Sequence, residues 1–161
     1  MMKMIYFHLF QVQMWATNME HLCKATPTEM VAVRALLYKY WGALGLKRDV
    51  LMDKDTFING VSKLGKEDLK RKKTGTPTLL GELNEAWYDV IDQDNDGTLT
   101  LEELEAVMEA TSMDKAGAKE WMKHLDKDNS GGIDKAEYMR AEHNFWYRSK
   151  KRGTSTSGPK K

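Results

Sequence analysis

The 161-residue sequence has little cysteine, no long apolar run and none of the common catalytic motifs. Its single cysteine, Cys23, excludes an internal disulfide framework and is best explained as a small buried hydrophobic side chain. No apolar stretch approaches the roughly 20 residues that a helix needs to cross a bilayer. A nucleophile elbow, a phosphate-binding glycine loop and zinc-like histidine spacing are absent. We therefore expect neither an enzyme, nor a transmembrane protein, nor a disulfide-rich secreted protein.

Charge is unevenly distributed along the chain. Residues 148–161 contain six lysines and arginines and no acid, which leaves 19 basic and 24 acidic residues, a charge of −5, in residues 1–147. A folded nucleic-acid-binding domain usually has a basic face rather than a basic end, so nucleic acid is not an expected partner. We predict that residues 148–161 form a disordered basic tail, with contact to acidic lipids as the alternative.

The first twelve residues are rich in apolar side chains, but His8 and Gln11 interrupt them and no small-residue cleavage site follows. A packed helix explains this stretch better than a signal peptide, and we predict a cytoplasmic protein. The apolar side chains of this expected helix are Ile5, Leu9, Val12 and Trp15.

Two later stretches carry helix start signals. Thr26, Pro27 and Glu29 combine an N-cap, a first-turn proline and a capping box. Apolar residues then recur at three- and four-residue steps, which indicates a helix with one buried face. Thr76 and Pro77 begin a second such helix.

Between these helices lies a basic stretch, residues 63–73, with six basic residues and two acids. We predict a solvated linker there. A nucleic-acid or lipid patch is the alternative, which the lack of interleaved aromatic residues disfavours.

The segment from Asp92 to Glu103 fits the twelve-residue EF-hand loop at every position. A hard cation such as Ca²⁺ takes six to eight oxygen ligands, so side chains at alternate loop positions must turn inward together, and Gly97 permits the sharp bend that this requires. Leu99 is left to point into the core. The predicted ligands are Asp92, Asp94, Asp96, the carbonyl of Thr98, Thr100 directly or through water, and bidentate Glu103.

A second complete loop runs from Asp126 to Glu137. Four acids converge in each loop and would repel one another without a cation, so two acidic surface turns do not explain the shared spacing. We predict two Ca²⁺ sites, with Mg²⁺ as a competitor. The predicted ligands of the second site are Asp126, Asp128, Ser130, the carbonyl of Gly132, Asp134 and bidentate Glu137.

Apolar helical stripes flank both loops, so each is expected to form a helix-loop-helix unit. We predict an all-α fold of EF-hand-like pairs, in which Leu99 and Ile133 meet in a short two-stranded contact that couples the sites. The expected organisation is an incomplete N-terminal lobe (1–75) that ends in the basic linker, an EF-hand pair (76–147) and the tail (148–161).

The chain resembles the sarcoplasmic calcium-binding proteins and the Ca²⁺-regulated photoproteins over about residues 20–147. The resemblance rests on the two loops and on four softer marks: the 23–29 lead-in, the 76–79 helix entry, the 87–92 run and the 143–147 ending. It implies a degenerate hand at about 30–66, whose loop, 45–56, has Lys47 and Thr56 where ligand acids belong. We expect that loop to bind no metal.

The resemblance also implies a metal-binding first hand, yet residues 1–44 contain no acidic loop. An unpaired hand exposes apolar surface. We hypothesise that the N-terminal lobe is completed by the first helix, by self-association or by further residues.

Two functions fit these features. The first is an intracellular Ca²⁺ buffer or sensor, in which some of the eleven methionines either fill the core or grip an amphipathic target helix. The second, implied by the resemblance, is a Ca²⁺-triggered photoprotein or luciferin-binding protein that holds coelenterazine beside a histidine, a tryptophan and a tyrosine; His143, Trp146 and Tyr147 resemble that set.

Several departures count against the second function. The spacing between the histidine and the tryptophan is one residue short, and Val61 and Leu83 stand where photoproteins usually have tryptophan. The family's terminal proline, which seals the pocket, is replaced by the basic tail, and the first hand is missing. We therefore favour the buffer or sensor.

Overall fold

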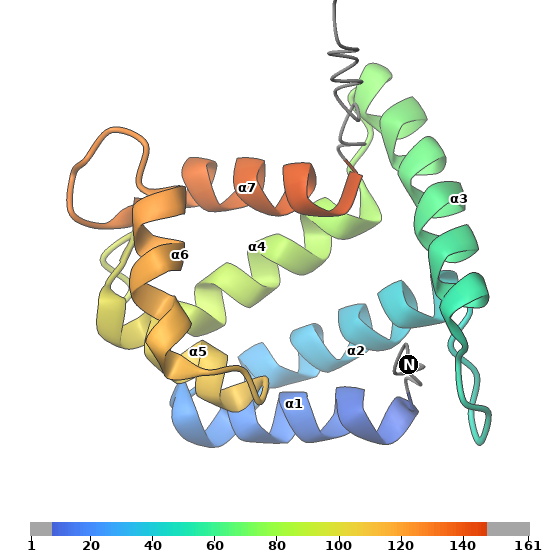
Figure 1. Cartoon of the computed structure of the whole chain (residues 1–161), viewed down its shortest axis with the longest axis horizontal. Helices are drawn as coiled ribbons and strands as arrows, with labels where there is room; N and C mark the ends of the chain where they lie inside the picture. The colour runs from blue at the N-terminus through green and yellow to red at the C-terminus, as the bar shows by residue number, and fades with distance from the viewer. Residues whose placement is uncertain (1–7, 148–161) are drawn as a thin grey trace, which may run out of the picture.

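A computed structural model describes residues 8–147. Within that range the chain forms seven α-helices, a short 3₁₀ helix and a two-stranded antiparallel sheet (Figure 1). The predicted all-α class with EF-hand-like pairs is confirmed. The elements are α1 Leu9–Leu22, α2 Pro27–Ala43, α3 Lys54–Lys73, α4 Leu79–Ile91, β1 Thr98–Leu99, α5 Leu101–Ala110, η1 Lys115–Gly117, α6 Ala118–Leu125, β2 Ile133–Asp134 and α7 Lys135–Tyr147.

Helix α2 begins where the sequence predicts. The Thr26 side chain accepts a hydrogen bond from the Glu29 backbone N–H, and the Glu29 carboxylate accepts one from the Thr26 N–H, so the capping box is complete. Pro27 takes the first helical position, where its missing N–H leaves no unmet hydrogen bond.

Helix α1 packs on two other helices, one next to it in sequence and one in the EF-hand pair. Its buried face, Val12, Ala16 and Met19, packs on α2 and α5, and Asn18 donates a hydrogen bond to the Ala110 carbonyl. Ile5 and the rest of residues 1–7 lie outside the described residues.

The basic stretch predicted as a solvated linker is instead the second half of α3. Leu64, Gly65 and Asp68 are buried on one side of this helix, while the lysines and arginines remain exposed on the other. The linker interpretation was wrong because high charge density was taken for absence of structure. The adjacent residues Leu64 and Gly65, and Asp68 one turn later, instead give the helix a buried face.

Buried Asp68 also explains why the next helix starts later than predicted. Its carboxylate accepts hydrogen bonds from the backbone N–H groups of Leu79 and Leu80, at 3.2 and 3.3 Å, and Thr78 caps the Gly81 N–H. These acceptors bind the backbone N–H groups that have no partner within the first turn of α4. The helix therefore begins at Leu79 rather than at Thr76.

The helices enclose a common interior. Helices α1 and α2 lie side by side, α4 crosses above them, and α7 lies over α4 with α5 and α6 at one end and α3 at the other (Figure 1). Contacts of α2 with α4 and of α3 with α7 join helices of the two predicted lobes. The division into lobes stays a prediction, and the predicted tail lies outside the described residues.

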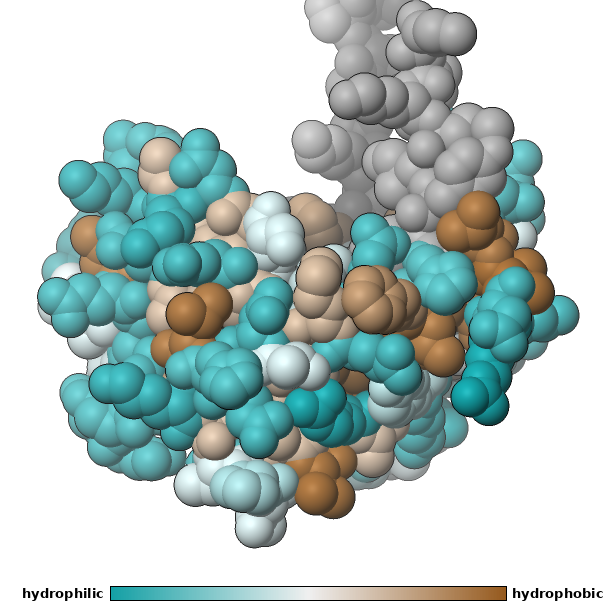
Figure 2. All heavy atoms as spheres, turned by 90° about the horizontal axis from the view of Figure 1, so that it is seen from below, coloured by the Kyte–Doolittle hydropathy of each residue, from teal (hydrophilic) through white to brown (hydrophobic). Residues whose placement is uncertain are grey.

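Hydrophilic side chains dominate the face shown in Figure 2, with hydrophobic atoms gathered toward the side on which Figure 1 places α3. On and before that helix, Val50, Leu51 and Ile58 are each about half exposed. Among residues 8–147, no helix combines the length and apolarity that a membrane crossing requires.

Candidate metal centre and aromatic cavity

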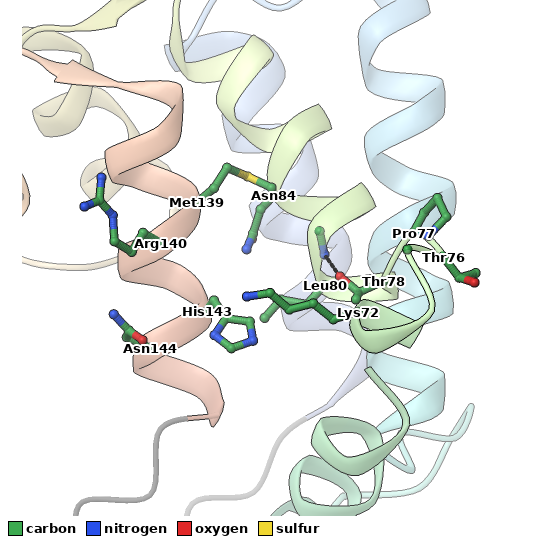
Figure 3. A pocket seen from close by; sticks show the side chains of 12 residues that line it. Lys72, Thr76, Pro77, Thr78, Leu80, Asn84, Met139, Arg140, His143 and Asn144 are labelled. Atoms are coloured by element: carbon green, nitrogen blue, oxygen red, sulfur yellow. Dashed lines mark hydrogen bonds between the residues drawn. The ribbon is translucent and has the colours of Figure 1, made fainter. Parts of the chain in front are cut away.

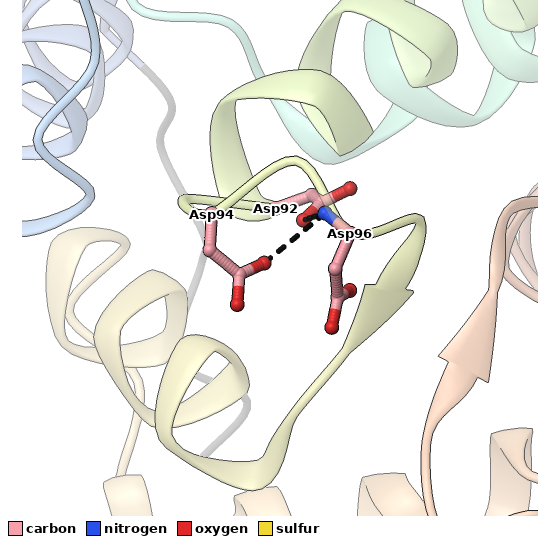
Figure 4. Close-up of side chains that lie close together, drawn as sticks. All are labelled: Asp92, Asp94 and Asp96. Carbon is pink, nitrogen blue, oxygen red and sulfur yellow. Dashed lines mark hydrogen bonds between the residues drawn. The ribbon is translucent and has the colours of Figure 1, made fainter.

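The first acidic loop lies between α4 and β1, and its three aspartates converge (Figure 4). One carboxylate oxygen from each of Asp92, Asp94 and Asp96 lies within 4.8 Å of the others. Backbone N–H groups of Asp96 and Gly97 bind the Asp92 carboxylate at 3.2 and 3.0 Å. Gly97 has φ +86°, a conformation that glycine adopts without strain, so the predicted bend is present.

The closing glutamate of this loop, Glu103, bonds to the backbone at both ends of the loop. Glu103 accepts hydrogen bonds from the Gln93 N–H and the Thr100 N–H, both at 2.8 Å, and thus joins the start of the loop to the start of α5. Burial raises the pKa of Asp92, and the nearby Glu103 charge adds to that rise. A bound cation would relieve the cost of holding these carboxylates ionised out of water.

The second loop repeats this arrangement between α6 and β2. Oxygens of Asp126, Asp128 and Glu137 lie within 4.8 Å of one another. Glu137 accepts a hydrogen bond from the Lys127 N–H at 2.8 Å, which matches the bond from Gln93 to Glu103 in the first loop. Gly131, with φ +89°, takes the place of Gly97.

The remaining predicted ligands lie in both loops but take part in local hydrogen bonds. Thr100 and Asp134 accept bonds from the Glu103 and Glu137 N–H groups. The Ser130 hydroxyl donates to the Gly132 carbonyl at 3.0 Å, and Thr98 lies in β1. The assignment of all twelve positions as ligands therefore stays a prediction, although the donor set is all oxygen and suits a hard cation such as Ca²⁺ or Mg²⁺.

The two loops are physically joined. Strands β1 and β2 pair antiparallel, with Leu99 opposite Ile133 as predicted, and both side chains are fully buried. Sequence reasoning missed the part played by Tyr88. Its hydroxyl lies 2.8 Å from the Gly97 carbonyl oxygen and 3.0 Å from that of Ile133, so one side chain binds both loops.

A cavity of about 340 Å³ lies among the helices that lead into and out of these loops. Half of the residues that line it are aromatic. Trp41 stacks on Phe57, and the ring of Trp146 lies edge-on to both Phe57 and Tyr40. The lining residues are Trp15, Leu37, Tyr40, Trp41, Phe57, Leu80, Leu83, Asn84, Trp87, Ile91, Val107, Thr111, Met113, Trp121, Tyr138, Glu142, Phe145 and Trp146.

The three residues that resemble a ligand-binding set do not come together in this cavity. Trp146 lines it, and one helical turn earlier the cavity wall is formed by Glu142, whose carboxylate accepts a hydrogen bond from Trp146 Nε1 at 3.3 Å. Tyr147 lies edge-on to His143 and donates a hydrogen bond to Asp68 at 2.9 Å. The four-residue spacing from Glu142 to Trp146 is the signal that could have identified this pair in the sequence.

His143 lines a different pocket, of about 500 Å³, between α7 and the junction of α3 with α4 (Figure 3). Lys72 and Arg140 line the same pocket. Burial, and then the charge of Lys72, hold the pKa of His143 below its usual value. Leu80 and Asn84 contribute to both pockets, so the two adjoin.

Comparison with known proteins agrees with this geometry. Residues 80–142 match the family model described as an EF-hand domain pair. The chain is 30% identical over 125 residues to Aequorin-2 of Aequorea victoria, which covers 76% of this chain and 64% of that protein. The chain therefore spans less than two thirds of this relative's length.

Solved structures give the same picture. Calcium-loaded apo-aequorin from Aequorea victoria superimposes with a TM-score of 0.77 at 26% identity, covering 89% of this chain and 81% of that one. The apoAequorin complex with (S)-HM-daCTZ gives 0.76 at 27% identity, covering 88% and 75%. The chain thus contains an EF-hand domain pair, the fold of Ca²⁺-binding loops, and is similar to the Ca²⁺-regulated photoproteins.

Proposed function

We propose that this EF-hand protein, which is similar to the Ca²⁺-regulated photoproteins, holds a small aromatic ligand in its aromatic cavity and that Ca²⁺ binding at two loops controls the occupancy of that cavity. The proposal assigns the chain a binding role in the cytoplasm and no catalytic turnover. It differs from our first expectation of a simple buffer or sensor.

The observation that carries the proposal is the direct continuity between cavity wall and metal loops. Ile91 lines the cavity, and Asp92, the first residue of the first loop, follows it. Tyr138 lines the cavity and follows Glu137, the last residue of the second loop. These covalent neighbours give a direct route by which a change in the loops on cation binding would reach the cavity wall.

The size and chemistry of the cavity suit an aromatic ligand. Its volume lies within the roughly 300–1,000 Å³ typical of small-molecule sites. Aromatic walls stabilise flat ligands through stacking and burial of apolar surface. The resemblance to photoproteins makes coelenterazine the natural first probe, and the related apoAequorin structure was determined with (S)-HM-daCTZ.

Two features favour binding over light emission. The cavity presents a carboxylate, Glu142, one turn before Trp146, while His143 lines the other pocket. Leu83, which replaces an expected tryptophan, lines the cavity with a smaller, non-aromatic side chain. We expect coelenterazine to bind, and we expect no flash when Ca²⁺ is added in air.

Calorimetric titration of coelenterazine into chelator-stripped protein, with and without Ca²⁺, tests the proposal. Binding is expected in at least one of these states, with affinities that differ between them. The double variant Glu103→Gln, Glu137→Gln should bind the ligand equally well with and without Ca²⁺, because each loop loses its bidentate acid. Absence of ligand binding in both states would overturn the proposal.

A Ca²⁺ buffer or sensor would give a different result. It would bind Ca²⁺ without any effect of the ligand, and a sensor would in addition gain affinity for amphipathic peptides. Repeating the Ca²⁺ titration in millimolar Mg²⁺ would show whether Mg²⁺ competes at these loops.

A further inference from the structure

One charged side chain faces the aromatic cavity. Among the described residues that line it, Glu142 alone carries a formal charge; the others are aromatic, aliphatic or neutral polar. Glu142 is partly buried, and a charge that is partly removed from water is destabilised unless it is paired.

The structure gives Glu142 little compensation. Its carboxylate accepts a single hydrogen bond from the described residues, from Trp146 Nε1 at 3.3 Å, although two carboxylate oxygens offer about four acceptor positions. No lysine, arginine or histidine among those residues forms an ion pair with it. Burial raises the pKa of Glu142 to about 6, so the group is mostly ionised at neutral pH.

A second polar group, the hydroxyl of Tyr40, is buried in the cavity wall. Tyr40 is 1% exposed, and its hydroxyl has no hydrogen-bond partner among the described residues. Its ring lies 5.8 Å from that of Trp146, which in turn binds Glu142. Burial raises the pKa of Tyr40, the neighbouring Tyr147 hydroxyl lowers it by less, and the charges of Asp68 and Glu142 raise it further, so the phenol stays neutral and able to donate or accept.

Around these two groups the aromatic rings supply electron-rich faces. Trp146, Phe57 and Trp41 form a continuous series with centroid separations of 6.1 and 6.2 Å. Rings of this kind attract cations, most strongly where water is excluded. An aromatic enclosure with one carboxylate and no basic residue in its described wall favours a positive ligand and repels a negative one.

We infer that this cavity, in its proposed role as a ligand site, selects a hydrophobic amine in its protonated form, with the ammonium group beside Glu142 and Tyr40 and the apolar part among Trp41, Phe57 and Trp146. The inference rests on the proposed function and adds the chemical class of the ligand. A protonated amine supplies charged hydrogen bonds to Glu142, which are stronger than those of a neutral hydroxyl or N–H group.

Three probes with one ring system and different charge test the inference: naphthylmethylamine, naphthylmethanol and naphthylacetate. Each is titrated by calorimetry into the full-length protein at neutral pH in chelator and again in Ca²⁺. The amine should bind at least about tenfold more tightly than the alcohol, and the acid should bind most weakly.

Glu142→Gln is the informative variant, because glutamine keeps the shape of the side chain and removes its charge. It should reduce the affinity for the amine to about that for the alcohol, while the affinity for the alcohol stays within about twofold. Glu85→Gln removes the same charge from the exposed surface of α4 and should change neither affinity.

The outcomes separate the two proposals. Equal binding of amine and alcohol, or unchanged amine binding by Glu142→Gln, would overturn the inference and leave the proposed ligand site standing. Tightest binding of the acid would also overturn it. Failure of coelenterazine to bind both in chelator and in Ca²⁺ would overturn the proposed ligand site itself, whatever the three probes do.

Discussion

At the scale of single residues, Glu142 has opposite effects on stability and on binding. Burial raises the pKa of Glu142 to about 6 from an ordinary 4.5. The folded state therefore binds this proton more tightly than the unfolded state does. The contribution of this group to stability is therefore greatest below about pH 4.5 and falls as pH rises through 6.

We predict that Glu142→Gln raises the free energy of unfolding by about 1–2 kcal/mol at pH 7.5 and has almost no effect at pH 4.5. Urea denaturation of the variant and of the unmodified protein, at both pH values and in chelator, measures the difference in their free energies of unfolding. All other ionisable groups are common to the two proteins, so their effects cancel in this difference. An equal difference at both pH values would show that the carboxylate is not destabilised by burial.

Tyr88 is the residue whose role is most specific to the metal sites, because its hydroxyl contacts a carbonyl in each loop. Tyr88→Phe keeps the ring and removes this link. We expect a loss of about 1 kcal/mol in stability and weaker cooperativity between the two Ca²⁺ sites in a calorimetric titration. Tyr38→Phe, at an exposed tyrosine, should change neither quantity; equal effects of both variants would exclude a specific link.

At the scale of elements, the contact of α3 with α7 depends on a close approach at Gly65. A Cβ atom added to Gly65 would lie 2.9 Å from Cδ1 of Tyr147, whose hydroxyl binds Asp68. At Gly42 in α2, by contrast, an added Cβ would have no heavy atom within 4 Å. Alanine substitution at these two glycines gives the same gain in helix propensity, but only at Gly65 does it also disturb packing.

We predict that Gly42→Ala stabilises the protein by about 0.5–1 kcal/mol, as expected for alanine in a helix. Gly65→Ala should lower stability by about 1 kcal/mol or more despite the same gain in helix propensity, because α7 must move away from α3. Thermal denaturation in Ca²⁺ compares the two variants. A stabilising Gly65→Ala would contradict the close packing of these helices.

The contacts between α3, α4 and α7 show which features the sequence could predict and which it could not. Short-range signals predicted the start of α2 at Thr26 and Pro27 and the facing of Leu99 and Ile133, because the partners lie within one turn or one repeated motif. The pairing of Asp68 with Leu79, Leu80 and Tyr147 links three separate helices. No local pattern specifies such contacts, so the second half of α3 was mistaken for a linker.

The candidate site also has a part that local sequence patterns predict and a part that they do not. Both acidic loops were predicted from fixed spacing, and the structure brings three acids of each together. A ligand pocket was expected only as an alternative, from the resemblance to photoproteins. Local patterns did not predict the aromatic cavity, because its wall combines residues from α1 to α7 that are distant in sequence. His143 was grouped with Trp146 by the resemblance to photoproteins, whereas helical geometry places Glu142 on the face of Trp146.

At the scale of the whole molecule, metal loops and cavity share the same helices. Helix α4 carries Leu83, Trp87 and Ile91 in the cavity wall and then enters the first loop, while α7 leaves the second loop and carries Glu142 and Trp146. Coupling between two sites is reciprocal, so a ligand whose affinity depends on Ca²⁺ must change the affinity for Ca²⁺ by the same factor.

The most direct test of this account is therefore one calorimetric titration of Ca²⁺ into chelator-stripped protein, repeated at saturating coelenterazine. The account predicts two Ca²⁺ ions bound per chain and a change of about fivefold or more in Ca²⁺ affinity when the ligand is present. Superimposable titrations at demonstrated saturation would contradict the coupling of the cavity to the metal loops, and a single bound Ca²⁺ would contradict the assignment of both loops.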